Sequence, residues 1–68
     1  MSIVRCIEVI AQSPKGFDDA CQQAVSQAGQ TVRGIRSLWV KNAECQVDDD
    51  NKIVNYRVNA KISFEVER

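Results

Sequence analysis

The sequence predicts an α+β fold in which a three-stranded antiparallel sheet wraps around one helix, with the elements in the order β-α-β-β. Residues 53–67 alternate between apolar and polar side chains, as in a strand with one buried face. Residues 17–28 instead repeat their apolar side chains at the helical period. Two further segments, residues 2–11 and 32–47, are rich in residues that favour strands. The 68 residues suffice for one domain, so residues 1–68 are expected to fold as a single unit.

The first strand, expected over residues 2–11, carries apolar side chains on both faces, so the pattern leaves open which face meets the core. A helix should follow it, because Ser13 is a favoured N-cap residue and Pro14 suits the first helical position. Gly29 is expected to end this helix. One side of the helix is an apolar stripe that needs one sheet face to cover it, formed by Phe17, Ala20, Cys21, Ala24, Val25 and Ala28.

The other two strands should form a hairpin, since residues 47–52, VDDDNK, have the composition of a turn. Their even-numbered positions supply the apolar face that covers the helix. The opposite face is too apolar for a surface that meets only water, because it carries Ile35, Trp39, Ala43, Cys45, Val47 and Ile53. Such a patch usually marks an interaction surface, so we expect another subunit to cover it. A β-bulge would change the parity and turn Ile53 or Val47 inward instead.

The small size of the chain points to association with further copies. A chain of this length buries only about 60% of its unfolded surface, and small domains compensate with disulfides, metals or partner subunits. The three cysteines form no C-x-x-C pair and the sequence has no histidine, which excludes a zinc site built from Cys and His. Cys6 and Cys21 are expected in the core, and Cys45 nearer the surface. A homo-oligomer is therefore the expected source of additional stability.

Charge and hydropathy exclude several partner classes. Nine basic and nine acidic residues balance, which argues against a general nucleic-acid-binding protein. No apolar run reaches the roughly 18–20 residues needed to span a membrane, so no membrane partner is expected. The N-terminal residues do not have the pattern of a signal peptide, and reduced cysteines favour the cytoplasm.

Catalysis is not expected, and no residue is assigned a catalytic role. A Ser or Cys nucleophile needs an activating base, and the sequence has no histidine to supply one. The run Asp48-Asp49-Asp50 offers oxygen ligands for Ca²⁺, but Asp is a favoured turn residue, so we expect a turn and assign no metal site. Arg57 and Lys61 on the outward face are either solvated charges or, in an assembly, contacts for phosphates and carboxylates.

Several motifs occur in an order that resembles one protein family. Ser13-Pro14 is followed by Phe17 and Ala20, and then by T-x-R-G-I-R at Thr31 to Arg36. The segment from Tyr56-Arg57-Val58 continues into Ala60 to Phe64. Over roughly residues 3–66 the chain resembles the dodecins. That resemblance implies a small flavin-binding protein, with flavin storage or buffering as its role, that assembles twelve copies into a hollow shell. It also implies a flavin stacked on the Trp that follows G-I-R and hydrogen-bonded to a Gln in the last strand.

The chain departs from this pattern at both diagnostic positions, because Ser37 replaces the Trp and Arg57 replaces the Gln. Loss of the ring removes about 1 kcal/mol or more of stacking, and Arg lacks the acceptor of an amide. Trp39 lies about 6–7 Å further along the same face of the strand. It either serves as a displaced platform or fills the flavin space, with Arg57 stacked on it as a cation–π pair.

The resemblance therefore implies two functions. In the first, Ser37, Trp39 and Arg57 form a binding site at the subunit interface for a flavin such as FMN, riboflavin or FAD, or for another small aromatic ligand. In the second, the flavin site is empty, and the chain builds a divergent non-flavin shell with a structural, anion-binding or metal-binding role.

Overall fold

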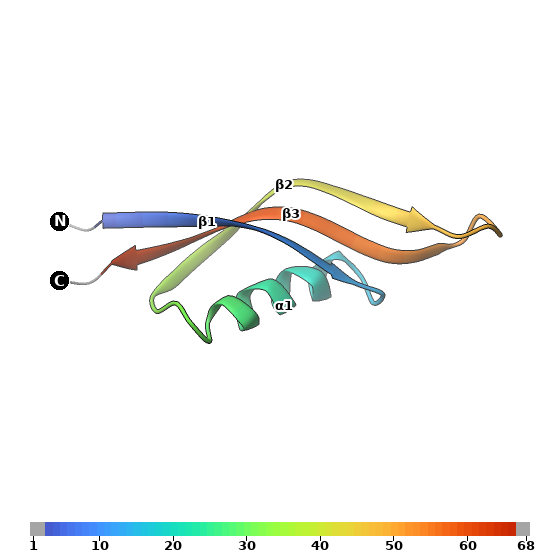
Figure 1. The fold of residues 1–68 in the computed structure, drawn as a ribbon. Coiled ribbons are helices and arrows are strands. Elements are labelled where there is room, and N and C mark those ends of the chain that lie inside the picture. The colour runs from blue at the N-terminus through green and yellow to red at the C-terminus, as the bar shows by residue number, and fades with distance from the viewer. Residues whose placement is uncertain (1–2, 67–68) are drawn as a thin grey trace.

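A computed structural model of the chain describes residues 3–66, in which three strands form one antiparallel sheet and one helix lies against a single face of it (Figure 1). The strands are β1 (Ile3–Ser13), β2 (Ile35–Val47) and β3 (Ile53–Val66), and the helix is α1 (Phe17–Ala28). β3 is the central strand, and β1 and β2 flank it. The predicted fold class and element order are confirmed.

The core lies between α1 and the middle of β3. The buried apolar side chains of the described residues are Ala20, Ala24, Val58, Ala60 and Ile62. They belong to the helical stripe and the even-numbered face of β3, as the two periodicities predict. At one end of this layer Phe17 packs edge-to-face on Tyr56, with ring centroids 5.1 Å apart. β1 turns its odd-numbered positions toward the helix, because Ile7, Val9 and Ala11 pair with the buried residues of β3.

The helix begins later than the sequence predicts, and Ser13 is not its N-cap. Ser13 still belongs to β1, where it pairs with Tyr56 and is buried. Its hydroxyl donates to Asp19 Oδ2 at 2.5 Å and accepts the backbone N–H of Lys15. The helix starts at Phe17 after Gly16, which provides no side-chain cap. The serine thus fixes the turn into the helix from the end of the strand. Gly29 ends the helix, as predicted.

β2 also starts later than predicted, at Ile35 instead of residue 32. Gly34 has a φ of 77°, in the left-handed region that a strand does not use and that glycine tolerates best. A Cβ at this position would stand 2.8 Å from the backbone oxygen of Glu65. The Glu65 N–H also donates to the Gly34 carbonyl oxygen at 3.0 Å. The close approach of these two backbones therefore sets where β2 begins.

Three register shifts in the β2–β3 pair change which side chains face the helix. The extra residues are Arg36 and Lys41 in β2 and Val54 in β3. The predicted outward position is wrong for Ile35, Ala43 and Cys45, which pair with the helix-facing Phe64, Val58 and Tyr56. The prediction is confirmed for Trp39, which pairs with the outward-facing Lys61. Val47 and Ile53 are exposed, and Val54, predicted on the buried face, is exposed as well.

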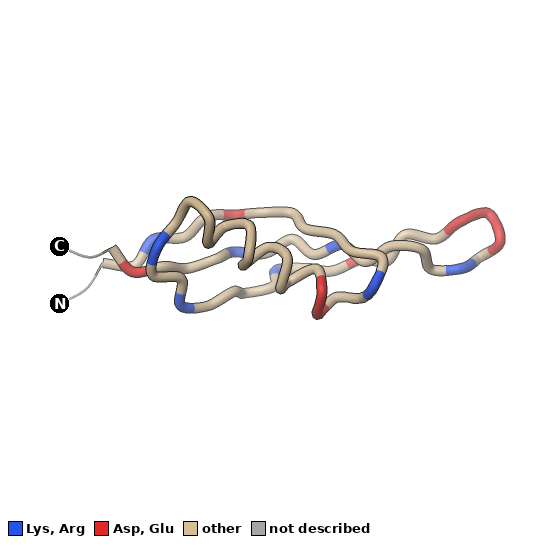
Figure 2. The backbone as a smooth tube through the Cα atoms, turned by 90° about the horizontal axis from the view of Figure 1, so that it is seen from below, with Lys and Arg blue, Asp and Glu red and all other residues tan. Residues whose placement is uncertain are grey.

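The β2–β3 hairpin extends well past the helix and the end of β1, which gives the molecule an elongated shape of 53 × 20 × 13 Å (Figure 1). We call residues 47–54 at its end the arm. Its tip carries the acidic residues 48–50, at the opposite end of the molecule from the start of β1 and the end of β3 (Figure 2). Asp48 Oδ1 accepts the backbone N–H groups of Asp50 and Lys52, at 2.8 and 3.1 Å. The predicted turn is thereby confirmed.

Candidate functional site on the outer sheet face

The face of the sheet opposite α1, called here the outer face, carries the residues that the sequence singles out. Its side chains line up across the three strands in rows, because the strands pair in register. One row contains Cys6, Ser63 and Ser37, and the next contains Glu8, Lys61 and Trp39. Ile10, Asn59 and Asn42 follow, and then Gln12, Arg57 and Glu44. Ser37, Trp39 and Arg57 therefore share one surface.

Trp39 is the largest apolar side chain on this face, and 63% of its surface is exposed. The Lys61 ammonium lies over the indole, 5.8 Å from the ring centroid, within the range of a cation–π contact. The expected partner of the ring, Arg57, is not brought to it within the chain. Arg57 is four residues from Lys61 along β3, which corresponds to about 13 Å. Within the described chain, Lys61 is thus the cation placed over the indole, and most of the Trp39 surface remains exposed.

Ser37 lies one pleat from Trp39, as the spacing predicts. Its hydroxyl is hydrogen-bonded to that of Ser63 on the central strand. Cys6 of β1 completes this row, so the row consists of three small side chains, those of Cys6, Ser63 and Ser37. A ring can stand over this row next to the indole, since side chains in a sheet project roughly perpendicular to it.

The Arg57 side chain is held on the outer face by residues of both neighbouring strands. Its Nε and Nη2 atoms donate to Gln12 Oε1 at 3.3 and 3.1 Å, and its Nη1 atom lies 3.9 Å from Glu44 Oε1. Asn55 also donates to Gln12 Oε1, at 3.0 Å. The guanidinium is thus part of a hydrogen-bonded ladder across the sheet, and its donors are directed along the surface.

Glu8 and Lys41 are site residues that the sequence reasoning missed. Lys41 Nζ donates to Glu8 Oε2 at 2.9 Å, so its side chain reaches from β2 past the central strand to β1. This hydrogen bond and the lysine charge lower the pKa of Glu8, with smaller contributions from Lys61 and Asn59. The two residues are 33 positions apart in the sequence, and only the register of the three strands brings them together. No local sequence signal marks such a pair.

The cysteines and acidic residues of the described chain do not gather into a metal site. Within residues 3–66 there is no group of three or more metal-ligating side chains from Cys, Asp and Glu. Cys6, predicted in the core, is exposed because it lies on the outer face of β1. Cys45 is exposed as predicted, and Cys21 is partly buried. Asp48 is engaged in the turn, so Asp49 and Asp50 are the carboxylates of the tip that remain for a cation.

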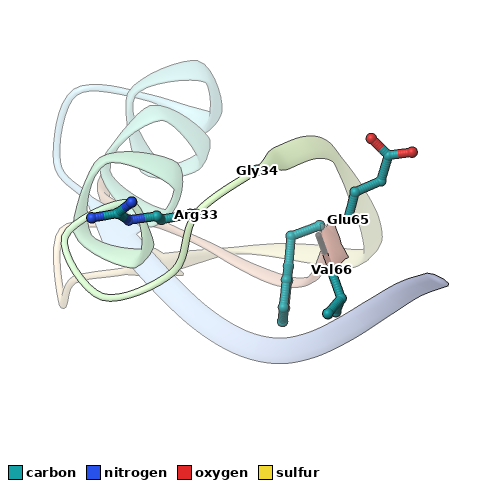
Figure 3. A pocket seen from close by; sticks show the side chains of 5 residues that line it. Arg33, Gly34, Glu65 and Val66 are labelled. Carbon is teal, nitrogen blue, oxygen red and sulfur yellow. The ribbon is translucent and has the colours of Figure 1, made fainter. Parts of the chain in front are cut away.

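A separate pocket lies where β2 begins and β3 ends. It has a volume of about 490 Å³ and is lined by Arg33, Gly34, Phe64, Glu65 and Val66 (Figure 3). The Arg33 side chain points away from the Glu65 carboxylate (Figure 3). Glu65 instead accepts from Arg36 Nε at 2.9 Å. This pocket contains none of the three predicted site residues.

In residues 3–66 there is also no helix long and apolar enough to cross a membrane.

The fold and the outer face define a small α+β protein whose open sheet surface is available for contact. The family model described as Dodecin matches residues 3–67 of the chain. The calcium dodecin of Mycobacterium tuberculosis (strain ATCC 25618 / H37Rv) is 33% identical over 66 residues, which cover 97% of this chain and 92% of that protein. The chain belongs to the dodecin family.

Solved structures agree with this assignment. The structure of dodecin from Streptomyces coelicolor is 31% identical with a TM-score of 0.89, over 98% of this chain and 94% of that one. The crystal structure of the calcium-chelating antigen calcium dodecin from Mycobacterium tuberculosis, with a novel calcium-binding site, is 32% identical with a TM-score of 0.80. That match covers 97% of this chain and 93% of the other.

Proposed function

We propose that the protein is a homo-oligomeric binding and storage protein, without catalytic activity, that holds a flavin-type ligand between its chains. In this proposal about twelve copies form a closed shell with the symmetry of a point group. The ligand, FMN, riboflavin or FAD, lies on the outer face against Trp39. The observation that carries the proposal is the exposed indole, with 63% of its surface uncovered on an open sheet.

Assembly through the outer face is supported by its apolar content. Val4 and Ile10 of β1 are 57% and 69% exposed, and both share this face with Trp39. Covering apolar surface stabilises by about 25 cal/mol per Å², and a domain of this size gains little from its own core. A second copy placed on this face would bury these residues together.

The geometry favours a ring that stands over the small row of Cys6, Ser63 and Ser37. A ring in that place lies in the row next to Trp39, within reach of its exposed indole. Lys61 then contributes a positive charge at the edge of the site, where a phosphate or an electron-rich ring carbonyl is accommodated. Arg57 keeps its contacts with Gln12 and Glu44, and it offers donors at the rim of the site.

Fluorescence quenching tests this function. Addition of the purified protein to FMN or riboflavin should quench the flavin emission at micromolar concentration, because the stacked indole contacts the flavin ring. Trp39→Ala should weaken binding by about tenfold or more, since an aromatic contact contributes roughly 0.5–1.5 kcal/mol beyond its buried area. Trp39→Phe, which keeps a ring, is the matched control. Absence of quenching by the intact protein would refute the flavin proposal.

A second candidate is a dodecin shell that holds calcium instead of flavin. It is favoured by Ser37 and Arg57, which replace the expected flavin contacts, and by the 33% identity to a protein named calcium dodecin. The exposed Asp49 and Asp50 would supply oxygen ligands from several chains. Calorimetric titration with Ca²⁺ separates the two candidates: heat that disappears in Asp49→Asn/Asp50→Asn, together with no flavin quenching, would select the calcium shell.

A further inference from the structure

Among residues 3–66, one buried side-chain polar atom lacks a hydrogen-bond partner, and it is the Oδ1 atom of Asn59. Asn59 lies on the central strand of the outer face, in the row with Ile10 and Asn42 and next to the row of Trp39. Leaving a buried carbonyl oxygen without a donor is costly, and folded proteins contain few such atoms. The unpaired acceptor therefore points to a donor from outside the described chain.

The direction of the Asn59 amide is set by Glu8. The side chain of Asn59 acts as a hydrogen-bond donor to the Glu8 carboxylate, and this contact is one of the causes that lower the pKa of Glu8. An ionised carboxylate accepts hydrogen bonds and donates none, so a reversed amide would place its oxygen against another acceptor. Oδ1 therefore stays on the side away from Glu8, where a binding partner must bring an N–H or O–H group to it.

The Lys41 side chain covers this acceptor only loosely. Lys41 directly precedes Asn42, which pairs with Asn59, and its ammonium reaches Glu8 on the far strand at 2.9 Å. The lysine chain therefore crosses the central strand beside Asn59. The side chains of this ion pair are 37% and 47% exposed, and exposed ion pairs contribute little to stability. A ligand can thus move the lysine chain aside and reach the amide.

The acceptor lies within reach of a ring that contacts Trp39. Ser63 of the small row and Asn59 are four residues apart on β3, which corresponds to about 13 Å along the strand. A three-ring system that stands over the small row, with its long axis along β3, passes the Trp39 indole and directs its far edge toward Asn59. A flavin carries an N–H group between two carbonyls at one end of its ring system, the imide N3–H. This group is the donor that Oδ1 lacks.

We propose that Asn59 selects the ligand of the outer face by accepting a hydrogen bond from an imide N–H group at the edge of its ring system. The inference rests on the proposed flavin-type ligand and adds the chemical group by which that ligand is recognised. Arg57 does not replace Asn59 in this role, because a guanidinium only donates hydrogen bonds. Flavins with a free N3–H group bind well, and flavins alkylated at N3 bind poorly, although both present the same stacking surface to Trp39.

A comparison of two ligands tests this selection on the unmodified protein. Riboflavin and N3-methylriboflavin have the same ring system, but the methyl group replaces the N–H donor. Fluorescence-quenching titration of the wild-type protein should give a dissociation constant about tenfold higher for the methylated ligand, because Oδ1 remains unpaired in that complex.

A matched pair of variants shows whether Asn59 is responsible. Asn59→Val removes the acceptor and introduces a residue that favours strands. The ratio of the two dissociation constants should fall from about ten to about one or below, because neither ligand then meets an acceptor. Asn42→Val makes the same change at the other asparagine of the row, and it should keep the ratio at about ten. Circular dichroism verifies that each variant is folded.

The outcomes separate this inference from the proposed function. If the wild-type protein quenches neither ligand, the flavin proposal fails and the inference fails with it. If the wild type binds both ligands equally, or if Asn59→Val still prefers riboflavin tenfold, the role of Asn59 is refuted while the flavin site stands. An equal loss of preference in Asn42→Val also refutes that role, since the polarity of the whole row would then select the ligand.

Discussion

At the scale of single residues, Trp39 is bordered by charges that come from all three strands. Lys61 lies over its ring, and Glu8 stands across the same row. Lys41 reaches Glu8 from β2 and completes the cluster. The exposed indole therefore stands next to two cations and one carboxylate, which leaves a net positive charge beside the proposed ligand.

The pKa of Glu8 reports on this cluster. It is lowered from its ordinary value of 4.5, first by the hydrogen bond from Lys41, then by the lysine charge. A lowered folded pKa means that the stabilising contribution is complete above pH 4.5 and is lost as the pH falls through the folded value. Lys41→Met should raise the Glu8 pKa toward 4.5, as followed by carbon-detected NMR titration of the carboxyl group. Lys52→Met, at the distant arm, should leave it in place; an unshifted Glu8 in Lys41→Met would contradict the assignment.

At the scale of elements, the β2–β3 hairpin depends on a few backbone contacts. Asp48 Oδ1 accepts two N–H groups across the turn, and Asn51 adopts a φ of 63°. At the other end of β2, Gly34 lies against the backbone of Glu65. The turn and the glycine together fix where the long hairpin starts and reverses.

Asp48→Ala should destabilise the protein by about 1 kcal/mol, because it removes the acceptor of two turn hydrogen bonds. Asp49→Ala removes a neighbouring carboxylate that makes neither of these bonds, and it should have a smaller effect. Denaturant unfolding of both variants measures the difference. Equal losses would show that charge at the tip, and not the turn bonds, determines stability.

Gly34→Ala should destabilise by about 1–3 kcal/mol, because it combines a positive φ with a Cβ held against backbone. The Cβ would lie 2.8 Å from the Glu65 carbonyl oxygen, which cannot rotate away. Gly29→Ala is the control, since its φ of −64° suits alanine and its Cβ would stand 3.2 Å from the Val25 carbonyl oxygen, a milder contact than at Gly34. Thermal unfolding should place Gly34→Ala well below Gly29→Ala; the reverse order would rule out this explanation.

Sequence periodicity predicted β3 well and β2 only in part. β3 alternates regularly from Asn55 onward, so Val58, Ala60 and Ile62 could be placed in the core from their spacing alone. In β2 the bulges at Arg36 and Lys41 each shift the alternation by one, which moved Ile35, Ala43 and Cys45 to the helix side. Trp39 was placed correctly because it lies between the two bulges. A bulge is specified by pairing with a distant strand, so the local pattern does not reveal it.

The charged pair of the site, Glu8 and Lys41, could not be predicted from the sequence either. Glu8 and Lys41 meet through the register of three strands, and neither belongs to a motif. Ser37 and Arg57, in contrast, stood out because the chain resembles a family with other residues there. The role of Ser13 was predicted only in part. Serine is a favoured N-cap residue, but Ser13 pairs with Tyr56 and therefore belongs to β1 instead of capping the helix.

At the scale of the whole molecule, the chain is long and thin. It extends 53 × 20 × 13 Å, and the buried apolar side chains of its described part come from a short section of helix and the central strand. Most of the sheet therefore has protein on one face only. A shape of this kind gains stability mainly when further copies cover the open surfaces.

Unfolding should consequently depend on protein concentration. If folding and assembly are coupled, a tenfold dilution lowers the free energy of unfolding per chain by about 1.4 kcal/mol. This lowers the melting temperature by roughly 6–11 °C for a domain of this size. Differential scanning calorimetry over a dilution series measures the shift. A melting temperature that stays constant on dilution would indicate that single chains are stable without partners.

The segment of β2 between its two bulges has a consequence for how such a surface can change over time. Positions 37 and 39 face the same way, so an aromatic ring can be exchanged from one to the other with no change of fold. The resemblance to the dodecins implies a ring at the first position, whereas this chain has its Trp at the second. Under the proposed function, the ring that contacts the ligand therefore lies two residues further along β2 than the resemblance implies, within the segment bounded by the bulges at Arg36 and Lys41.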